Sequence, residues 1–194
     1  MTRACVLLSI VFASFLGGCV QSLHPYYKED QLTYDGTLVG TWKPEESEES
    51  IVITGDADAK SYTAVYTDKE KKTGKFDVHL AKVNDRLLLD IAPAEPKRED
   101  ESDMYQVHLL PVHSFMLVER KDADTLVLRQ MDSDWLKAYL EKNPTAVAHE
   151  TLDKDRILLT APSEKVQAFV LEHVDTPDAY EDPSTLKRAA KAGE

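Results

Sequence analysis

Apolar and polar residues alternate in short segments over most of the chain between residues 38 and 131. Phe76, Val78 and Leu80, for example, are spaced two residues apart, with Asp77 and His79 between them. Side chains along a β-strand point alternately to opposite faces of a sheet, so this pattern predicts strands with one buried face and one wet face. The chain is therefore expected to be mainly β and antiparallel over residues 37–131.

Turn-like segments separate eight such runs, at about the 8–12-residue spacing that is typical of sandwiches and barrels. Asn84-Asp85, between two alternating runs, predicts a tight hairpin. We expect an antiparallel meander or a small barrel built from eight strands: Leu38–Lys43, Ser50–Thr54, Ser61–Thr67, Lys75–Val83, Arg86–Ile91, Met104–Leu110, His113–Arg120 and Thr125–Met131.

After residue 131 the apolar residues recur at helical spacing. The pattern predicts a helix over Ser133–Lys142 with Asp132 or Ser133 as its N-cap, a short strand over Ile157–Leu159, and a second helix capped by Ser163. We expect this helix-strand-helix extension, residues 132–174, either to seal the barrel or to pack beside it. Residues 175–194 contain two prolines and a basic ending, and are expected to form a flexible tail.

The first expected strand contains Gly40-Thr41-Trp42. This Gly-x-Trp motif, together with eight strands followed by a helix, resembles the signature of lipocalins. The resemblance implies that Gly40 permits a close backbone approach and that Trp42 plugs one end of the barrel. It also implies that a basic residue near the last strand, here Arg129, packs on the tryptophan ring. The Thr-Asp-Tyr motif of lipocalins is absent, so a core tryptophan in an unrelated small barrel is the alternative.

An eight-stranded barrel is either filled by its own side chains or just wide enough for one small ligand. The side chains expected to point inward here are numerous and mostly apolar, so a packed core and a pocket for a hydrophobic small molecule are both open. The residues expected to contact such a ligand are Trp42, Tyr62, Tyr66, Phe76 and Phe115.

The sequence contains none of the motifs that assemble common catalytic or metal sites. It has no Gly-x-Ser-x-Gly, no phosphate-binding Gly-rich loop and no His-Glu-x-x-His. Its two cysteines, Cys5 and Cys19, are too few for a cysteine-based zinc or iron–sulfur site. We therefore predict no catalytic residue, no metal and no cofactor, and a hydrolase or modifying enzyme with an unrecognised site is the alternative.

The beginning of the chain predicts export from the cytoplasm. Arg3 precedes an apolar run that ends at Leu16, which is short for a membrane span and typical of a secretory signal peptide, residues 1–18. The sequence Leu16-Gly17-Gly18-Cys19 resembles the lipobox of bacterial lipoproteins. That resemblance implies cleavage after Gly18, a thioether-linked diacylglyceryl group on Cys19 and a further acyl chain at the new amino terminus. An ordinary secretory peptide with a chance cysteine is the alternative.

Residues 19–36 show no sustained period and are expected to be a tether between lipid and domain. Val20, rather than an aspartate, follows Cys19; by analogy with sorting in enterobacterial lipoproteins, this implies the outer membrane, with the domain facing the periplasm.

The charge of the chain bears on its partners. Residues 1–18 contain one of the 23 basic residues and none of the 35 acidic ones, which leaves a net charge of −13 on the remainder. Such a surface disfavours nucleic acids. We expect a lipid-anchored envelope protein with a non-enzymatic binding or interaction role. Its partners would be the membrane and either a hydrophobic small molecule or an envelope protein.

Overall fold

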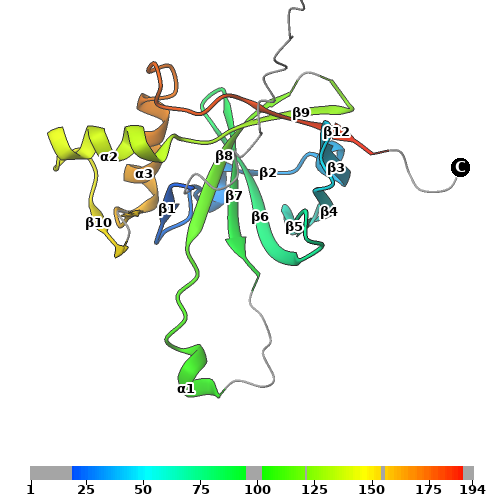
Figure 1. Ribbon diagram of the computed structural model, residues 1–194, viewed down its shortest axis with the longest axis horizontal. Coiled ribbons are helices and arrows are strands. Elements are labelled where there is room, and N and C mark those ends of the chain that lie inside the picture. The colour runs from blue at the N-terminus through cyan, green and yellow to red at the C-terminus, as the bar shows by residue number, and fades with distance from the viewer. Residues whose placement is uncertain (1–18, 95–101, 121, 154–155, 190–194) are drawn as a thin grey trace, which may run out of the picture.

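A closed barrel of eight antiparallel strands forms the centre of the protein (Figure 1). The computed structural model describes residues 19–94, 102–120, 122–153 and 156–189. Neighbouring barrel strands pair in chain order, and the last pairs with the first. This confirms the predicted fold class, mainly β with a small antiparallel barrel. The barrel strands are β3 (Gly40–Pro44), β4 (Ser50–Asp56), β5 (Ser61–Thr67), β6 (Thr73–Val83), β7 (Arg86–Pro93), β8 (His113–Arg120), β9 (Thr125–Arg129) and β12 (Ser184–Arg188).

The alternation in β6 places side chains as the sequence predicts. Val78 and Leu80 are buried in the barrel, whereas Asp77 is exposed. At the end of the strand, Asn84 adopts a φ of 53° in the two-residue turn to β7. Asparagine tolerates this left-handed conformation, which the tight turns of hairpins require, and the predicted hairpin at Asn84-Asp85 is confirmed.

The outer faces of β7 and β8 are buried as well, so the expectation of one wet face is wrong for these two strands. Leu88, Phe115 and Leu117 belong to a second hydrophobic core outside the barrel. Asp90, expected on the wet face, is also buried. Strand β7 is therefore covered on both sides, by the barrel core and by the second core.

The second core is completed by the extension, which lies between β9 and β12. It contains α2 (Ser133–Lys142), β10 (His149–Thr151), β11 (Ile157–Leu159) and α3 (Ser163–Glu172), which confirms the predicted order of helix, strand and helix. The carboxylate of Asp132 accepts a hydrogen bond from Trp135 N and caps α2. Helix α3 differs from expectation, since Ser163 is its first residue and the N-cap position is Pro162, without a side-chain cap. Both helices pack beside the barrel rather than sealing it (Figure 1).

One of the eight predicted strands is wrong. Within the predicted strand Met104–Leu110, the structure has the short helix α1 (Asp103–Gln106) followed by a turn. Ser102 Oγ accepts a hydrogen bond from Tyr105 N and so caps this helix. The eighth strand of the barrel is instead β12, which pairs with β3 and β9 and buries Leu186. The expected flexible tail therefore contains the strand that closes the barrel.

The segment expected to be a tether is folded onto the domain. Strand β1 (Gln21–Ser22) lies between β8 and β11, and Val20 and Tyr26 are buried in the second core. The segment continues through η1 (Glu29–Gln31), β2 (Leu32–Thr33) and η2 (Gly36–Leu38) to the start of β3. These residues join the sheet through backbone hydrogen bonds to strands that are distant in the chain. Their own strands are too short to show an alternating sequence pattern. The described chain is thus packed onto the domain from Val20 onward.

Candidate functional site

The two ends of the barrel differ in structure. At the Arg188 end, where β3 begins and β12 ends, the indole of Trp42 is fully buried and its Nε1 donates to Leu38 O over 2.8 Å. Arg188 lies over this indole, and its Nη1 donates to Val39 O over 2.8 Å. Gly40 has a φ of +144°, and a Cβ at this position would lie 2.3 Å from Arg188 Nη1. The glycine therefore permits the close approach of the guanidinium.

The basic residue expected on Trp42 was assigned wrongly. Arg129 lies over the ring of Tyr180, 5.4 Å from its centroid, and forms an ion pair of 2.8 Å with Glu119. Arg188 occupies the position over Trp42. The error follows from the wrong strand assignment, because the last barrel strand is β12 rather than β9.

Three of the five expected ligand-contacting residues belong to the barrel core. Trp42 and Tyr62 are buried there, and Phe76 packs against them. The ring of Tyr62 is stacked on Tyr34 at a centroid distance of 5.0 Å, and its hydroxyl accepts from Asp35 N. Tyr62 is therefore held by contacts within the protein.

The other two expected contacts, Tyr66 and Phe115, are not part of the barrel core cluster. Burial, with a smaller contribution from the carboxylate of Glu49, raises the pKa of Tyr66 to about 12. Phe115 belongs to the second core, where its ring lies 4.6 Å from that of Tyr26 and 6.3 Å from that of Tyr180. Phe115 is thus outside the barrel core, and the five residues do not surround one common space.

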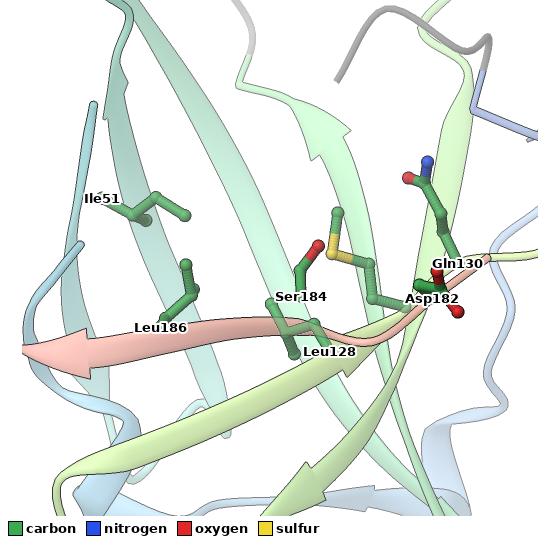
Figure 2. A pocket seen from close by; sticks show the side chains of 7 residues that line it. Ile51, Leu128, Gln130, Asp182, Ser184 and Leu186 are labelled. Carbon is green, nitrogen blue, oxygen red and sulfur yellow. The ribbon is translucent and has the colours of Figure 1, made fainter. Parts of the chain in front are cut away.

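A small hollow lies at the opposite end of the barrel, which we call the Cys19 end: here β8 and β12 begin and β9 ends. Its volume is about 30 Å³, room for one or two water molecules and far below the 300–1,000 Å³ of ordinary ligand pockets. Figure 2 shows Gln130 and Asp182 together at one side of the hollow and Ile51 at the other. Its lining comprises Ile51, Met116, Leu128, Gln130, Asp182, Ser184 and Leu186.

Cys19 lies beside this hollow, through its contact with Gln130. Its Sγ donates to Gln130 Oε1 over 3.4 Å, and Gln130 Nε2 donates to Glu181 Oε2 over 2.6 Å. Burial, together with the negative charge of Glu181, raises the pKa of the Cys19 thiol. Since the thiolate is the nucleophilic form, a raised pKa does not prepare Cys19 for catalysis.

The side-chain pair most similar to part of a catalytic site is Asp90 and His113, which the sequence analysis did not single out. His113 Nδ1 lies 2.8 Å from Asp90 Oδ2, and Asp90 Oδ1 accepts from Tyr26 N over 2.7 Å. Ser22 is opposite His113 in the strand register, but it is fully buried and its Oγ accepts from His24 N. A substrate has no access to this serine, so we assign the Asp90–His113 pair to holding the N-terminal segment on the sheet.

No group of three or more histidine, cysteine, aspartate or glutamate side chains is placed to hold a metal ion within residues 19–94, 102–120, 122–153 and 156–189. Comparisons of the chain with known protein families, with curated protein sequences and with solved structures found no match. Cys19, with its neighbours Gln130 and Glu181, is the candidate site of this chain.

Proposed function

We propose that this protein is a bacterial lipoprotein, attached to a membrane of the cell envelope through acyl chains on Cys19. The observation that carries the proposal is Leu16-Gly17-Gly18-Cys19 after an apolar run, with Val20, directly after the cysteine, buried in the second core. Cleavage after Gly18 would keep the buried Val20 in the mature chain. Cys19 is half-buried and belongs to neither hydrophobic core.

The attachment would hold the domain close to the bilayer. Because β1 starts two residues after Cys19, little chain separates the lipid from the barrel. Two or three acyl chains on one residue give a durable anchor, since a single chain binds only marginally. None of the helices in the described ranges is long and apolar enough to span a membrane. Val20 after Cys19 favours the outer membrane, with the domain in the periplasm.

The role we propose for the anchored domain is non-enzymatic binding or interaction at the envelope. The small volume of the hollow at the Cys19 end argues against a lipid-sized ligand there, and the buried Trp42 and Tyr62 argue for a packed barrel core. The proposed working surface is therefore the outside of the protein.

Fatty-acid incorporation tests the anchor. Cells producing the full chain are grown with an alkyne fatty acid, and the purified protein is coupled to an azide dye. We expect labelling of the natural chain and of Cys5→Ala, the matched control in the leader, and no labelling of Cys19→Ala. Equal labelling of Cys19→Ala, or none of the natural chain, would contradict the proposal.

A further inference from the structure

Large apolar side chains are exposed together on the connection between β7 and β8. Their exposed fractions run from 46% at Leu109 to 75% at Val107. Monomeric soluble proteins rarely expose such residues side by side, and where they do, the patch marks a membrane or protein contact. We call residues 102–112 the apolar arm; its exposed apolar residues are Met104, Tyr105, Val107, Leu109 and Leu110.

The arm is held by its own backbone rather than by packing. Val107 N donates to Asp103 O, and Leu109 N donates to Gln106 O, at 3.1 and 3.0 Å. None of residues 102–112 belongs to either hydrophobic core. Figure 1 shows α1 at the far end of this connection, away from the barrel and from α2 and α3. The local hydrogen bonds therefore present the apolar side chains outward.

Cys19 lies along β8, the strand into which the arm leads. β8 begins at His113, directly after the arm, and His113 pairs with Ser22 of β1 in antiparallel register. Cys19 precedes Ser22 by three residues, so the register places it toward Met116, farther along β8 from the base of the arm. A bilayer that receives acyl chains from Cys19 would therefore lie near the strand that carries the arm.

We propose that the apolar arm inserts its side chains into the interface of that same bilayer, as a second membrane contact beside the lipid. The position of the bilayer rests on the function proposed above. Residues 104–112 contain no Asp, Glu, Lys or Arg, in a chain with 30% charged residues. Tyr105 is a residue type enriched at membrane interfaces. A net charge of −13 on residues 19–194 makes zwitterionic lipid the suitable surface, because anionic headgroups would repel the body.

A bilayer fits the shape of the arm better than a protein partner does. A stable protein interface buries about 800 Å² on each partner and needs a complementary surface. The arm offers one helical turn at the end of a narrow connection, a projecting tip rather than a broad face. A fluid lipid surface can close around such a tip without a preformed groove.

An environment-sensitive label on the arm tests this directly. The natural lipoprotein carrying Val107→Cys is labelled with nitrobenzoxadiazole and incorporated into phosphatidylcholine–phosphatidylethanolamine vesicles. Val52→Cys is the control, since Val52 is 40% exposed on β4, away from the arm. We expect the label at 107 to be quenched by spin-labelled lipid and protected from aqueous iodide, and the label at 52 to behave oppositely. Equal access of iodide to both positions would overturn the proposal.

A second pair of variants separates insertion from labelling effects. Leu109→Gln and Leu110→Gln are added to the labelled protein. The ratio of lipid-inserted to water-exposed label at position 107 should fall about tenfold, because the transfer of two leucine side chains into lipid no longer stabilises insertion. Adding Leu152→Gln, at a position that is 37% exposed in the extension, should leave the ratio unchanged. An equal effect of both changes would also overturn the proposal.

The mass of the peptide that starts at Cys19, measured on the same sample, keeps the two proposals apart. An acyl mass with an unprotected label contradicts the arm alone. A missing acyl mass contradicts the anchor. If the label at position 107 is still protected when this unacylated protein is added to vesicles, the result supports insertion of the arm.

Discussion

The guanidinium of Arg188 lies over the indole of Trp42, with 4.3 Å between Cζ and the ring centroid. The two residues come from the last and first strands of the barrel and face each other in the register of β12 and β3. Arg188 Nη2 also donates to Thr37 O over 2.6 Å. The side chain of Arg188 thus joins the last strand of the barrel to the first.

Arg188→Gln should lower the free energy of unfolding by about 2–3 kcal/mol, because it removes a cation–π contact and charged hydrogen bonds to backbone carbonyls. Urea unfolding measures this. Arg86→Gln is the control: Arg86 pairs with Asp175 on the surface, and its loss should cost under about 1 kcal/mol. Equal losses for both variants would remove the special role of Arg188.

Gly40→Ala should destabilise the protein by about 2–3 kcal/mol. The positive φ of Gly40 is a strained backbone conformation for alanine, and the added Cβ would clash with Arg188. Gly36→Ala is the matched control, because its Cβ would lie 3.6 Å from Tyr34, an ordinary contact. In a double-mutant cycle, Arg188→Ala should relieve part of the Gly40→Ala cost. Strict additivity of the two changes would show that the close approach is unimportant.

Leu186→Ala should cost about 2–5 kcal/mol, the usual range for a buried leucine. Leu186 is buried on β12 within residues that look like a tail in the sequence. Leu152→Ala, at a more exposed leucine, provides the comparison. A small effect at Leu186, similar to that at Leu152, would mean that β12 does not close the barrel.

Asp90→Ala should free the N-terminal segment, because the carboxylate binds both Tyr26 N and His113. We expect a loss of about 2–4 kcal/mol, since buried donors remain without an acceptor. Faster hydrogen exchange at the Tyr26 amide would locate the effect. Asp77→Ala, at an exposed aspartate on β6, should change neither quantity appreciably.

Alkaline pH should destabilise the protein through Tyr26 and Tyr66, whose pKa values are raised in the folded state. Burial raises the pKa of Tyr26 well above its usual value and that of Tyr66 to about 12. A tyrosine of the unfolded chain ionises near pH 10, so the unfolded state loses protons first. The stabilisation is complete below pH 10 and is lost as pH rises from 10 through 12. Absorbance titration should show a late phase near pH 12 that is smaller in Tyr66→Phe, and an unchanged titration would contradict this.

Local pattern explains why most of the barrel was predictable. In β6, Phe76, Val78 and Leu80 face the interior because the period of two is built into the strand, and the Asn84 turn is specified by one residue type. The helices of the extension were predictable for the same reason, since their apolar stripes are long enough to define a period.

The elements that were missed depend on partners distant in the chain. Strand β12 has Leu186 as its one strongly apolar residue and becomes a strand because β3 and β9 hydrogen-bond to it on both sides. The residues Gln21–Ser22 of β1 are too few to show a period. The predicted strand Met104–Leu110 is wrong for the opposite reason. Its apolar residues suggest burial in a sheet, but the structure exposes them.

The candidate site, too, could be predicted from the sequence only in part. Cys19 was predictable because the motif around it is continuous in sequence. Arg188 was missed with its strand, and the neighbours of Cys19, Gln130 and Glu181, come together only through the fold.

The intact mass of the protein purified from bacterial envelopes most directly tests whether Cys19 is the point of attachment. The account predicts a chain that begins at Cys19 and carries two or three acyl chains there. A chain that retains residues 1–18, or that begins at Cys19 without added mass, would contradict it.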